Sequence, residues 1–121
     1  MTQRILVVED TEDNRQIMRD LLSNAGYELI ETVDGAAAVA MAQSERPDLI
    51  LMDIQLPQMD GYEATRRIRA VPELAKVPII AVTSYALSGE DVKAREAGCD
   101  GYVAKPFSPR ELLAKVREYL P

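Results

Sequence analysis

Five polar side chains share one placement in the sequence, because each follows directly on a short apolar run. They are Glu9, Asp10, Asp53, Thr83 and Lys105. If those runs are parallel strands, their carboxyl ends lie at one edge of a sheet, which is where such sheets bind ligands. We therefore expect three carboxylates, a hydroxyl and an ammonium to converge on one site.

This set of groups is suited to phosphoryl transfer. Three crowded carboxylates repel one another unless a cation joins them, and ligands that are all oxygens favour Mg²⁺ over zinc or copper. A carboxylate can act as a nucleophile and form an aspartyl-phosphate. The ammonium of Lys105 and the hydroxyl of Thr83 would then stabilise the phosphoryl oxygens.

The composition excludes several other kinds of site. The 121 residues include no histidine, which excludes a Ser-His-Asp nucleophile, a histidine zinc site and phosphohistidine on this chain. With 14 basic and 20 acidic residues the formal charge is −6, so no general attraction to nucleic acid or an anionic membrane is expected. The single cysteine, Cys99, cannot form an intramolecular disulfide, which fits a reducing compartment. Since no apolar run has transmembrane length, we expect a cytoplasmic protein that contacts neither membrane nor nucleic acid directly.

Short apolar runs alternate with longer amphipathic segments along the chain. Strands are predicted at residues 4–8, 27–31, 48–52, 79–82 and 101–104. Helices are predicted at 14–23, from a cap at Asp34 to about residue 43, at 61–71, from a capping sequence at 88–91 to near Gly98, and from a capping box that starts at Ser108. The strands are continuous apolar runs, which favours a parallel sheet covered by helices on both faces.

Several side chains are assigned structural roles. The apolar stripes of the first and last helices are predicted to be Ile17, Met18, Leu21 and Leu22, and Leu112, Leu113, Val116 and Leu120. Asp60 and Gly61 are interpreted as a turn with a permissive glycine. The arginines at positions 66, 67 and 69 are predicted to form a solvated helix face.

Four segments carry a resemblance to a known family. They are VVEDTEDNR at 7–15, LILMDIQLPQMDGYE at 49–63, PIIAVTS at 78–84 and GYVAKPF at 101–107. In this order and spacing they resemble the motifs of bacterial response-regulator receiver domains, over essentially the whole chain. The resemblance implies one receiver domain at residues 1–121 with an α/β fold: a doubly wound (βα)5, flavodoxin-like three-layer sandwich whose parallel five-stranded sheet has the order 2-1-3-4-5.

The resemblance also implies roles for individual residues. Asp53 would be the phosphoacceptor, and Mg²⁺ would be bound by Asp10 directly, by Glu9 mainly through water, by Asp53, and by the backbone carbonyl of Gln55. Lys105 would contact the phosphoryl group, and the Lys105–Pro106 peptide would be cis.

The implied switch consists of a hydroxyl and an aromatic ring. After phosphorylation Thr83 would move toward the phosphoryl group, and Tyr102 would turn inward into the space that it leaves. Gln55 and Tyr85 lie at positions that tune hydrolysis of the acyl phosphate in this family. We hypothesise that Tyr85 shields the phosphoryl group from water, so that a Tyr85→Ala variant should lose it faster.

The implied function is that of a signalling phosphoacceptor in a two-component system or phosphorelay, not an enzyme, although it assists its own phosphorylation and dephosphorylation. The donor would be a histidine kinase or a histidine phosphotransferase. A downstream protein would bind the surface formed by the fourth helix, the fifth strand and the fifth helix, and a phosphorylation-dependent dimer is compatible with this scheme. The start at Met1 favours a stand-alone regulator or an N-terminal receiver.

Three alternatives remain open at this stage. A Mg²⁺-dependent phosphatase that passes through aspartyl-phosphate commonly has a second acid two residues after the nucleophile, where this chain has Gln55. An interaction module of the same fold that is never phosphorylated usually lacks one of the key residues, and none is missing here. A flavin-binding protein is disfavoured, because an acidic pocket would repel the phosphate of the cofactor.

Overall fold

A parallel sheet forms the centre of the molecule in residues 2–84 and 89–121, which the computed structural model describes. Its five strands are β1 (Arg4–Val8), β2 (Glu28–Thr32), β3 (Leu49–Asp53), β4 (Ile79–Thr83) and β5 (Gly101–Ala104). Every neighbouring pair is parallel, and the order is β2-β1-β3-β4-β5. The predicted fold class and strand order are confirmed.

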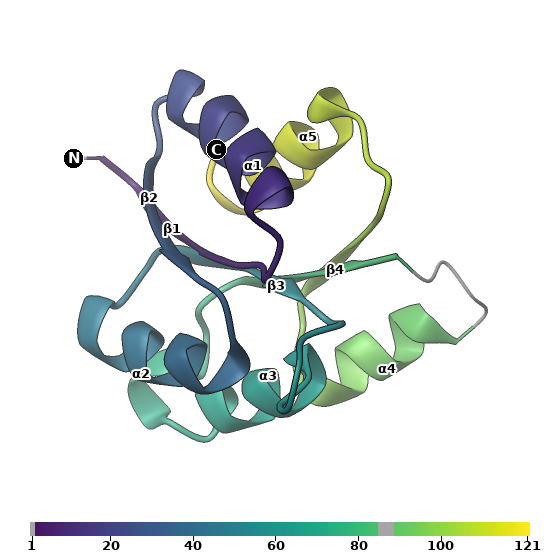
Figure 1. Ribbon diagram of the computed structural model, residues 1–121. Coiled ribbons are helices and arrows are strands. Elements are labelled where there is room, and N and C mark those ends of the chain that lie inside the picture. Colours follow the sequence, from purple (N-terminus) through teal and green to yellow (C-terminus); the bar gives the residue numbers. More distant parts are fainter. Residues whose placement is uncertain (1, 85–88) are drawn as a thin grey trace.

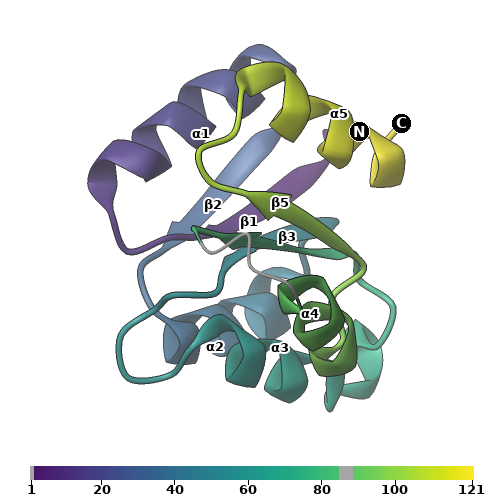
Figure 2. The same ribbon diagram turned by 90° about the vertical axis from the view of Figure 1, so that its right-hand side faces the viewer.

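Helices cover both faces of the sheet. They are α1 (Glu12–Asn24), α2 (Gly35–Glu45), α3 (Gly61–Arg69), α4 (Glu90–Ala97) and α5 (Pro109–Tyr119), with a short 3-10 turn, η1 (Pro72–Leu74), after α3. Helices α1 and α5 lie on one face, and α2, α3 and α4 lie on the other (Figures 1 and 2). No helix in the described part of the chain is both long enough and apolar enough to cross a membrane.

The three central strands, β1, β3 and β4, are almost entirely apolar because each contributes to two separate cores. Ile5 and Val7 of β1 pack under α1 and α5, whereas Leu6 and Val8 pack under α2, α3 and α4. Successive side chains of a strand point to opposite faces, so a strand covered on both sides needs an apolar residue at every position. Full burial of one such side chain contributes about 1.5–3 kcal/mol, which makes the sheet a rigid support for the residues at its edge.

Helix α1 differs from its prediction in two respects. It begins at Glu12, two residues before the predicted start: Thr11 is the N-cap, although its side chain makes no capping hydrogen bond, and Glu12 and Asp13 form an acidic first turn. Met18 and Leu22 are buried as predicted, but Ile17 is 51% exposed. One residue turns a helix by about 100°, so Ile17 lies at the margin of the stripe centred on Met18 and faces solvent.

The helices after strands β4 and β5 begin differently. Helix α5 has the predicted capping box, since Ser108 Oγ accepts a hydrogen bond from the amide of Glu111 at 3.1 Å and the Glu111 carboxylate accepts one from the amide of Ser108. Helix α4 ends before Gly98, as predicted, but its N-cap is Gly89, one residue after the expected cap. Ser88, which was expected to cap α4, lies outside the described residues.

Arg69 is not part of a solvated helix face, which corrects the prediction for this residue. Its guanidinium donates to the backbone oxygens of Gly98 at 2.9 Å and Leu74 at 3.0 Å, and it pairs with Asp100 at 2.7 Å. Arg66 and Arg67 do remain exposed and pair with Glu63. Arg69 is the last residue of α3 and faces the loop between α4 and β5. Its hydrogen bonds therefore connect the end of α3 to this loop.

Candidate functional site

The carboxyl ends of four strands bring the predicted site residues to one edge of the sheet. Glu9 and Lys105 directly follow β1 and β5, whereas Asp53 and Thr83 are the last residues of β3 and β4. Both of these strands extend one residue further than predicted, because the parallel ladder continues to the pairs Asp53–Val82 and Thr83–Ala104.

Three carboxylates form an acidic cluster at this edge. Glu9, Asp10 and Asp53 each offer an oxygen, and these oxygens lie within 4.8 Å of one another. Glu9 is fully buried and Asp53 is 3% exposed, whereas Asp10 is exposed. Burial and a hydrogen bond with Asp53 raise the pKa of Glu9, despite the opposing effect of Lys105.

Lys105 supplies the positive charge opposite these acids. Its Nζ lies 2.5 Å from Glu9 Oε1 and 3.3 Å from Asp53 Oδ2. Burial opposes the charge on Lys105, but the hydrogen bonds and ion pairs with both carboxylates outweigh it and raise the pKa of the ammonium. The Lys105–Pro106 peptide bond is cis.

Gln55 connects the Asp53 carboxylate to the end of β4. The backbone N–H of Gln55 donates to Asp53 Oδ1 at 3.0 Å, and the Gln55 side chain extends to the neighbouring strand, β4. There Gln55 Nε2 donates to Thr83 Oγ1 at 2.6 Å, while Gln55 Oε1 accepts from the amide of Ser84 at 3.0 Å. Thr83 is fully buried, so this bond helps to fix the hydroxyl next to the acidic cluster.

Gly61 packs directly against the backbone of Asp53 and Ile54, so its role differs from the permissive turn that was predicted. A Cβ on Gly61 would lie 2.4 Å from the Asp53 carbonyl oxygen and 2.8 Å from Ile54 Cα. The positive φ in this loop, 68°, belongs to Gln58 instead. Asp60 caps α3 by accepting from the amide of Glu63 at 2.9 Å. Glycine is therefore needed at position 61 for close approach to the strand, not for its backbone freedom.

The acidic cluster is chemically suited to a hard divalent cation. All of its ligand groups are carboxylates, and two of them, Glu9 and Asp53, are buried close together, where a bound cation would offset their negative charge. We therefore regard Glu9, Asp10 and Asp53 as a set that could hold a metal ion.

Comparison with known proteins agrees with this geometry. Residues 5–117 match the family model described as the response regulator receiver domain. The chain belongs to the response regulator receiver family. It is 42% identical over 120 residues to the polar-differentiation response regulator DivK of Brucella ovis, covering 99% of this chain and 98% of that protein.

Solved receiver structures share both the fold and the extent of this chain. The receiver domain of the sensor histidine kinase PA1611 from Pseudomonas aeruginosa, solved with a magnesium ion coordinated in its active-site cleft, has a TM-score of 0.92 and 42% identity, with 99% and 98% of the two chains covered. The chemotaxis response regulator CheY4 of Vibrio cholerae has a TM-score of 0.93 and 30% identity, with 98% and 99% covered. The present chain is thus a receiver of two-component signalling, and receivers of this family act as phosphoacceptors.

Of the two tyrosines to which the sequence assigned roles, Tyr102 lies within the described residues. Tyr102 lies in β5, is partly buried and packs against the core under α2, α3 and α4. The hypothesis for Tyr85 concerns a residue outside the described ranges. The sequence predicted a backbone-carbonyl ligand and a position that tunes hydrolysis for Gln55. It did not predict the contact of the Gln55 side chain with Thr83, because no local pattern indicates a hydrogen bond between two strand ends.

Proposed function

We propose that Asp53 of this receiver accepts a phosphoryl group from a phosphohistidine on a partner protein. The observation that supports the proposal best is the position of Lys105, whose ammonium is within 3.3 Å of the Asp53 carboxylate at the edge where all the strand ends meet. An ammonium placed there can neutralise a phosphoryl group bound to Asp53. Because the chain has no histidine, the donor has to be another molecule, and we propose a histidine kinase or a histidine phosphotransferase.

The proposed step is an in-line displacement at phosphorus. A carboxylate oxygen of Asp53 attacks, a new O–P bond forms, and the P–N bond of phosphohistidine breaks with its electron pair going to the imidazole. Lys105 offsets charge on the phosphoryl oxygens, and Thr83 donates a hydrogen bond to one of them. No separate substrate is turned over, so the protein acts as a phosphoacceptor that assists its own phosphorylation and dephosphorylation.

We propose that Mg²⁺ is the cofactor of this phosphoryl transfer. Asp10 and Asp53 would hold it directly, Glu9 mainly through water, and Gln55 through its backbone carbonyl. When bound, the ion would neutralise negative charge on the phosphoryl oxygens. The fixed positions of Glu9 beside Lys105 and of Asp10 at the surface support this division of roles.

Phosphorylation would then alter a protein-binding surface. We propose that Thr83 moves toward the phosphoryl group and that Tyr102 turns inward, which changes the surface formed by α4, β5 and α5. A downstream protein would recognise this surface, and a phosphorylation-dependent dimer is compatible with the same change. We further propose that residues 1–121 form one domain and that the protein is cytoplasmic, in keeping with the buried free thiol of Cys99.

The test is direct phosphorylation. The purified protein is incubated with Mg²⁺ and a small phosphodonor such as acetyl phosphate, and its intact mass is measured. We expect a gain of one phosphoryl group that is absent from Asp53→Asn and absent when Mg²⁺ is chelated. An unchanged mass, or equal labelling of the Asp53→Asn variant, would reject the proposal. Continued hydrolysis of simple phosphoesters would favour a phosphatase instead.

A further inference from the structure

The main chain of Glu9 is held on both sides. Its amide donates to the carbonyl of Thr32 at 3.1 Å, which extends the pairing of β1 with β2 by one residue. Its carbonyl accepts a hydrogen bond from Arg15 Nη1 at 2.8 Å. This carbonyl belongs to the peptide group between Glu9 and Asp10, so Arg15 contacts the backbone unit from which both acids of the first strand project.

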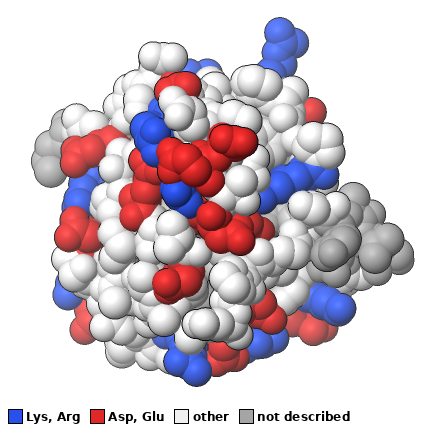
Figure 3. Space-filling model, viewed as in Figure 1, with Lys and Arg blue, Asp and Glu red and all other residues white. Residues whose placement is uncertain are grey.

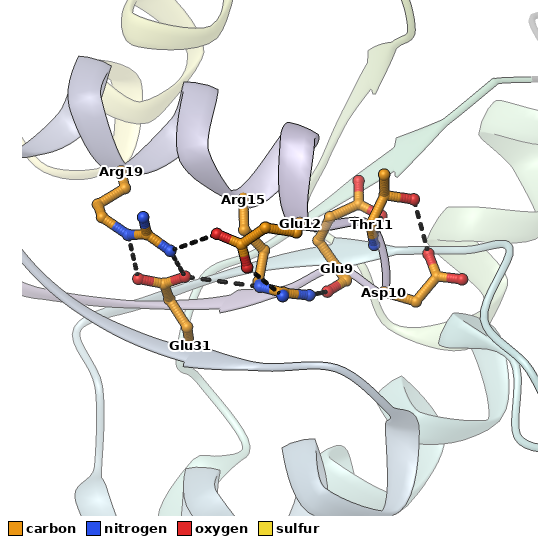
Figure 4. A network of polar contacts seen from close by, with 7 residues as sticks. All are labelled: Glu9, Asp10, Thr11, Glu12, Arg15, Arg19 and Glu31. Carbon is orange, nitrogen blue, oxygen red and sulfur yellow. Dashed lines mark hydrogen bonds and ion pairs between the residues drawn. The ribbon is translucent and has the colours of Figure 1, made fainter.

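Arg15 is set into a network of alternating charges. Its side chain is 13% exposed and pairs with Glu12 at 2.5 Å and with Glu31, in β2, at 3.6 Å (Figure 4). Acidic and basic side chains alternate over the same region of the surface, near the start of α1 (Figure 3). Because two carboxylates face the Arg15 guanidinium, its charge is compensated and should repel a nearby cation only weakly.

Arg19, one turn further along α1, provides a natural comparison. It makes a two-pronged pair with Glu31, with both nitrogen–oxygen distances at 2.8 Å, and a longer contact with Glu12 at 3.3 Å. It therefore shares both acidic partners with Arg15, and Figure 4 shows these partners and Arg15 lying between Arg19 and Glu9. The two arginines differ in one contact, the hydrogen bond to the Glu9 carbonyl.

We propose that Arg15 is a positioning residue for Mg²⁺ binding, acting through the carbonyl of Glu9 on the orientation of Glu9 and Asp10. The inference rests on the proposed function, because it assumes that these acids bind the ion. Groups that orient metal ligands without touching the metal commonly change metal affinity by 10–100-fold when they are removed, a range of about one to two orders of magnitude. A guanidinium is suited to the task because its fork can hold the carbonyl and both carboxylates at once.

The experiment compares Mg²⁺ affinity in Arg15→Met, Arg15→Lys and Arg19→Met. Methionine keeps the apolar stem of the arginine, and lysine keeps the charge and one donor group. Affinity is measured by isothermal titration calorimetry on unphosphorylated protein, and the Asp10 amide resonance is recorded without metal. We expect Arg15→Met to weaken Mg²⁺ binding about tenfold and to shift the Asp10 resonance, Arg15→Lys to recover part of the affinity, and Arg19→Met to stay within about twofold of the wild type.

The direction in which Mg²⁺ affinity changes in Arg15→Met distinguishes a loss of positioning from a loss of positive charge. Loss of a positive charge near a cation site should by itself tighten Mg²⁺ binding, whereas loss of positioning should weaken it. Unchanged or tighter binding in Arg15→Met, or equal weakening in Arg19→Met, would overturn the inference. If the wild type itself bound no Mg²⁺, the proposed function would fail first, so the two failures are distinguishable.

Discussion

The side-chain amide of Gln55 donates a hydrogen bond of 2.6 Å to the hydroxyl of Thr83, across the ends of two neighbouring strands. The same amide group accepts from Ser84, so a single side chain spans the end of β4. In the proposed mechanism Thr83 has to reach the phosphoryl group on Asp53, and the bond to Gln55 therefore stabilises the resting position of the hydroxyl.

Replacement of Gln55 by methionine should make it easier for the Thr83 hydroxyl to leave its resting position. The variant removes both side-chain hydrogen bonds and keeps the backbone carbonyl, and a hydrogen bond of this kind contributes about 0.5–1.5 kcal/mol to the resting state. We expect the phosphoryl mimic beryllofluoride to bind about 2–10-fold more tightly, as measured by titration with NMR detection. The exposed Gln43→Met variant is the control. Equal affinity in the Gln55→Met variant and the wild type would contradict the restraint on Thr83.

Introduction of a methyl group at Gly61 should disturb the phosphoacceptor strand. A Cβ would lie 2.4 Å from the carbonyl oxygen of Asp53, so the backbone of one of the two segments has to move. Overpacking of this kind costs about 1–3 kcal/mol. We expect Gly61→Ala to unfold at lower urea concentration and to be phosphorylated more slowly. Gly26→Ala is a suitable control, since it is strained by its φ of 97° but meets no atom within 4 Å. It should lose stability and keep its phosphorylation rate.

Removal of the Arg69 guanidinium should destabilise the fold without touching the site. Arg69→Met removes one donor each from the backbone oxygens of Gly98 and Leu74 and from the carboxylate of Asp100. The backbone amides of Val77 and Ile79 still donate to Leu74 and Asp100. We expect a loss of about 2–3 kcal/mol in the free energy of unfolding, measured by urea denaturation. Arg66→Met, at an exposed position on the same helix, should change it by no more than about 0.5 kcal/mol. Similar losses in the two variants would mean that Arg69 is an ordinary surface residue.

The ion pairs of Glu31 should contribute stability that depends on pH. The hydrogen bonds and charge of Arg19 lower the pKa of Glu31 below its ordinary value. Such a carboxylate stabilises the fold above its unfolded-state pKa of about 4.3, and this contribution disappears as the pH falls through the lower folded-state pKa. Glu31→Gln should therefore be less stable than the wild type at pH 7, by about 0.5–1 kcal/mol, and the difference should shrink in acid.

Denaturation of Glu31→Gln and wild type at several pH values measures this difference. Glu28→Gln serves as the matched control, because Glu28 lies in the same strand and is 59% exposed, with a longer contact of 3.8 Å to Arg4. A difference that stayed constant between neutral and acid pH would show that the loss in Glu31→Gln comes from packing and not from ionisation.

The fold and the charged residues of the site were predictable for physical reasons. Continuous apolar runs occur only where both faces of a strand are buried, and parallel strands end at a common edge, so the convergence of Asp53 and Lys105 followed from position in the chain. The contacts of Arg69 and the close approach of Gly61 were not predictable in this way. They join segments that are distant in sequence, and they depend on distances between elements that no local pattern encodes.

Both ends of the described chain lie at the edge of the sheet where the strands begin, opposite the acidic cluster (Figure 2). The carbonyl of Leu120 accepts a hydrogen bond from the hydroxyl of Tyr27, the residue before β2, and β1 begins at Arg4. A fluorescent protein, an affinity tag or a surface tether attached at either terminus would therefore project away from the acidic cluster. Labelled versions of this molecule should meet their phosphodonors unhindered, which makes it convenient for binding measurements on immobilised protein.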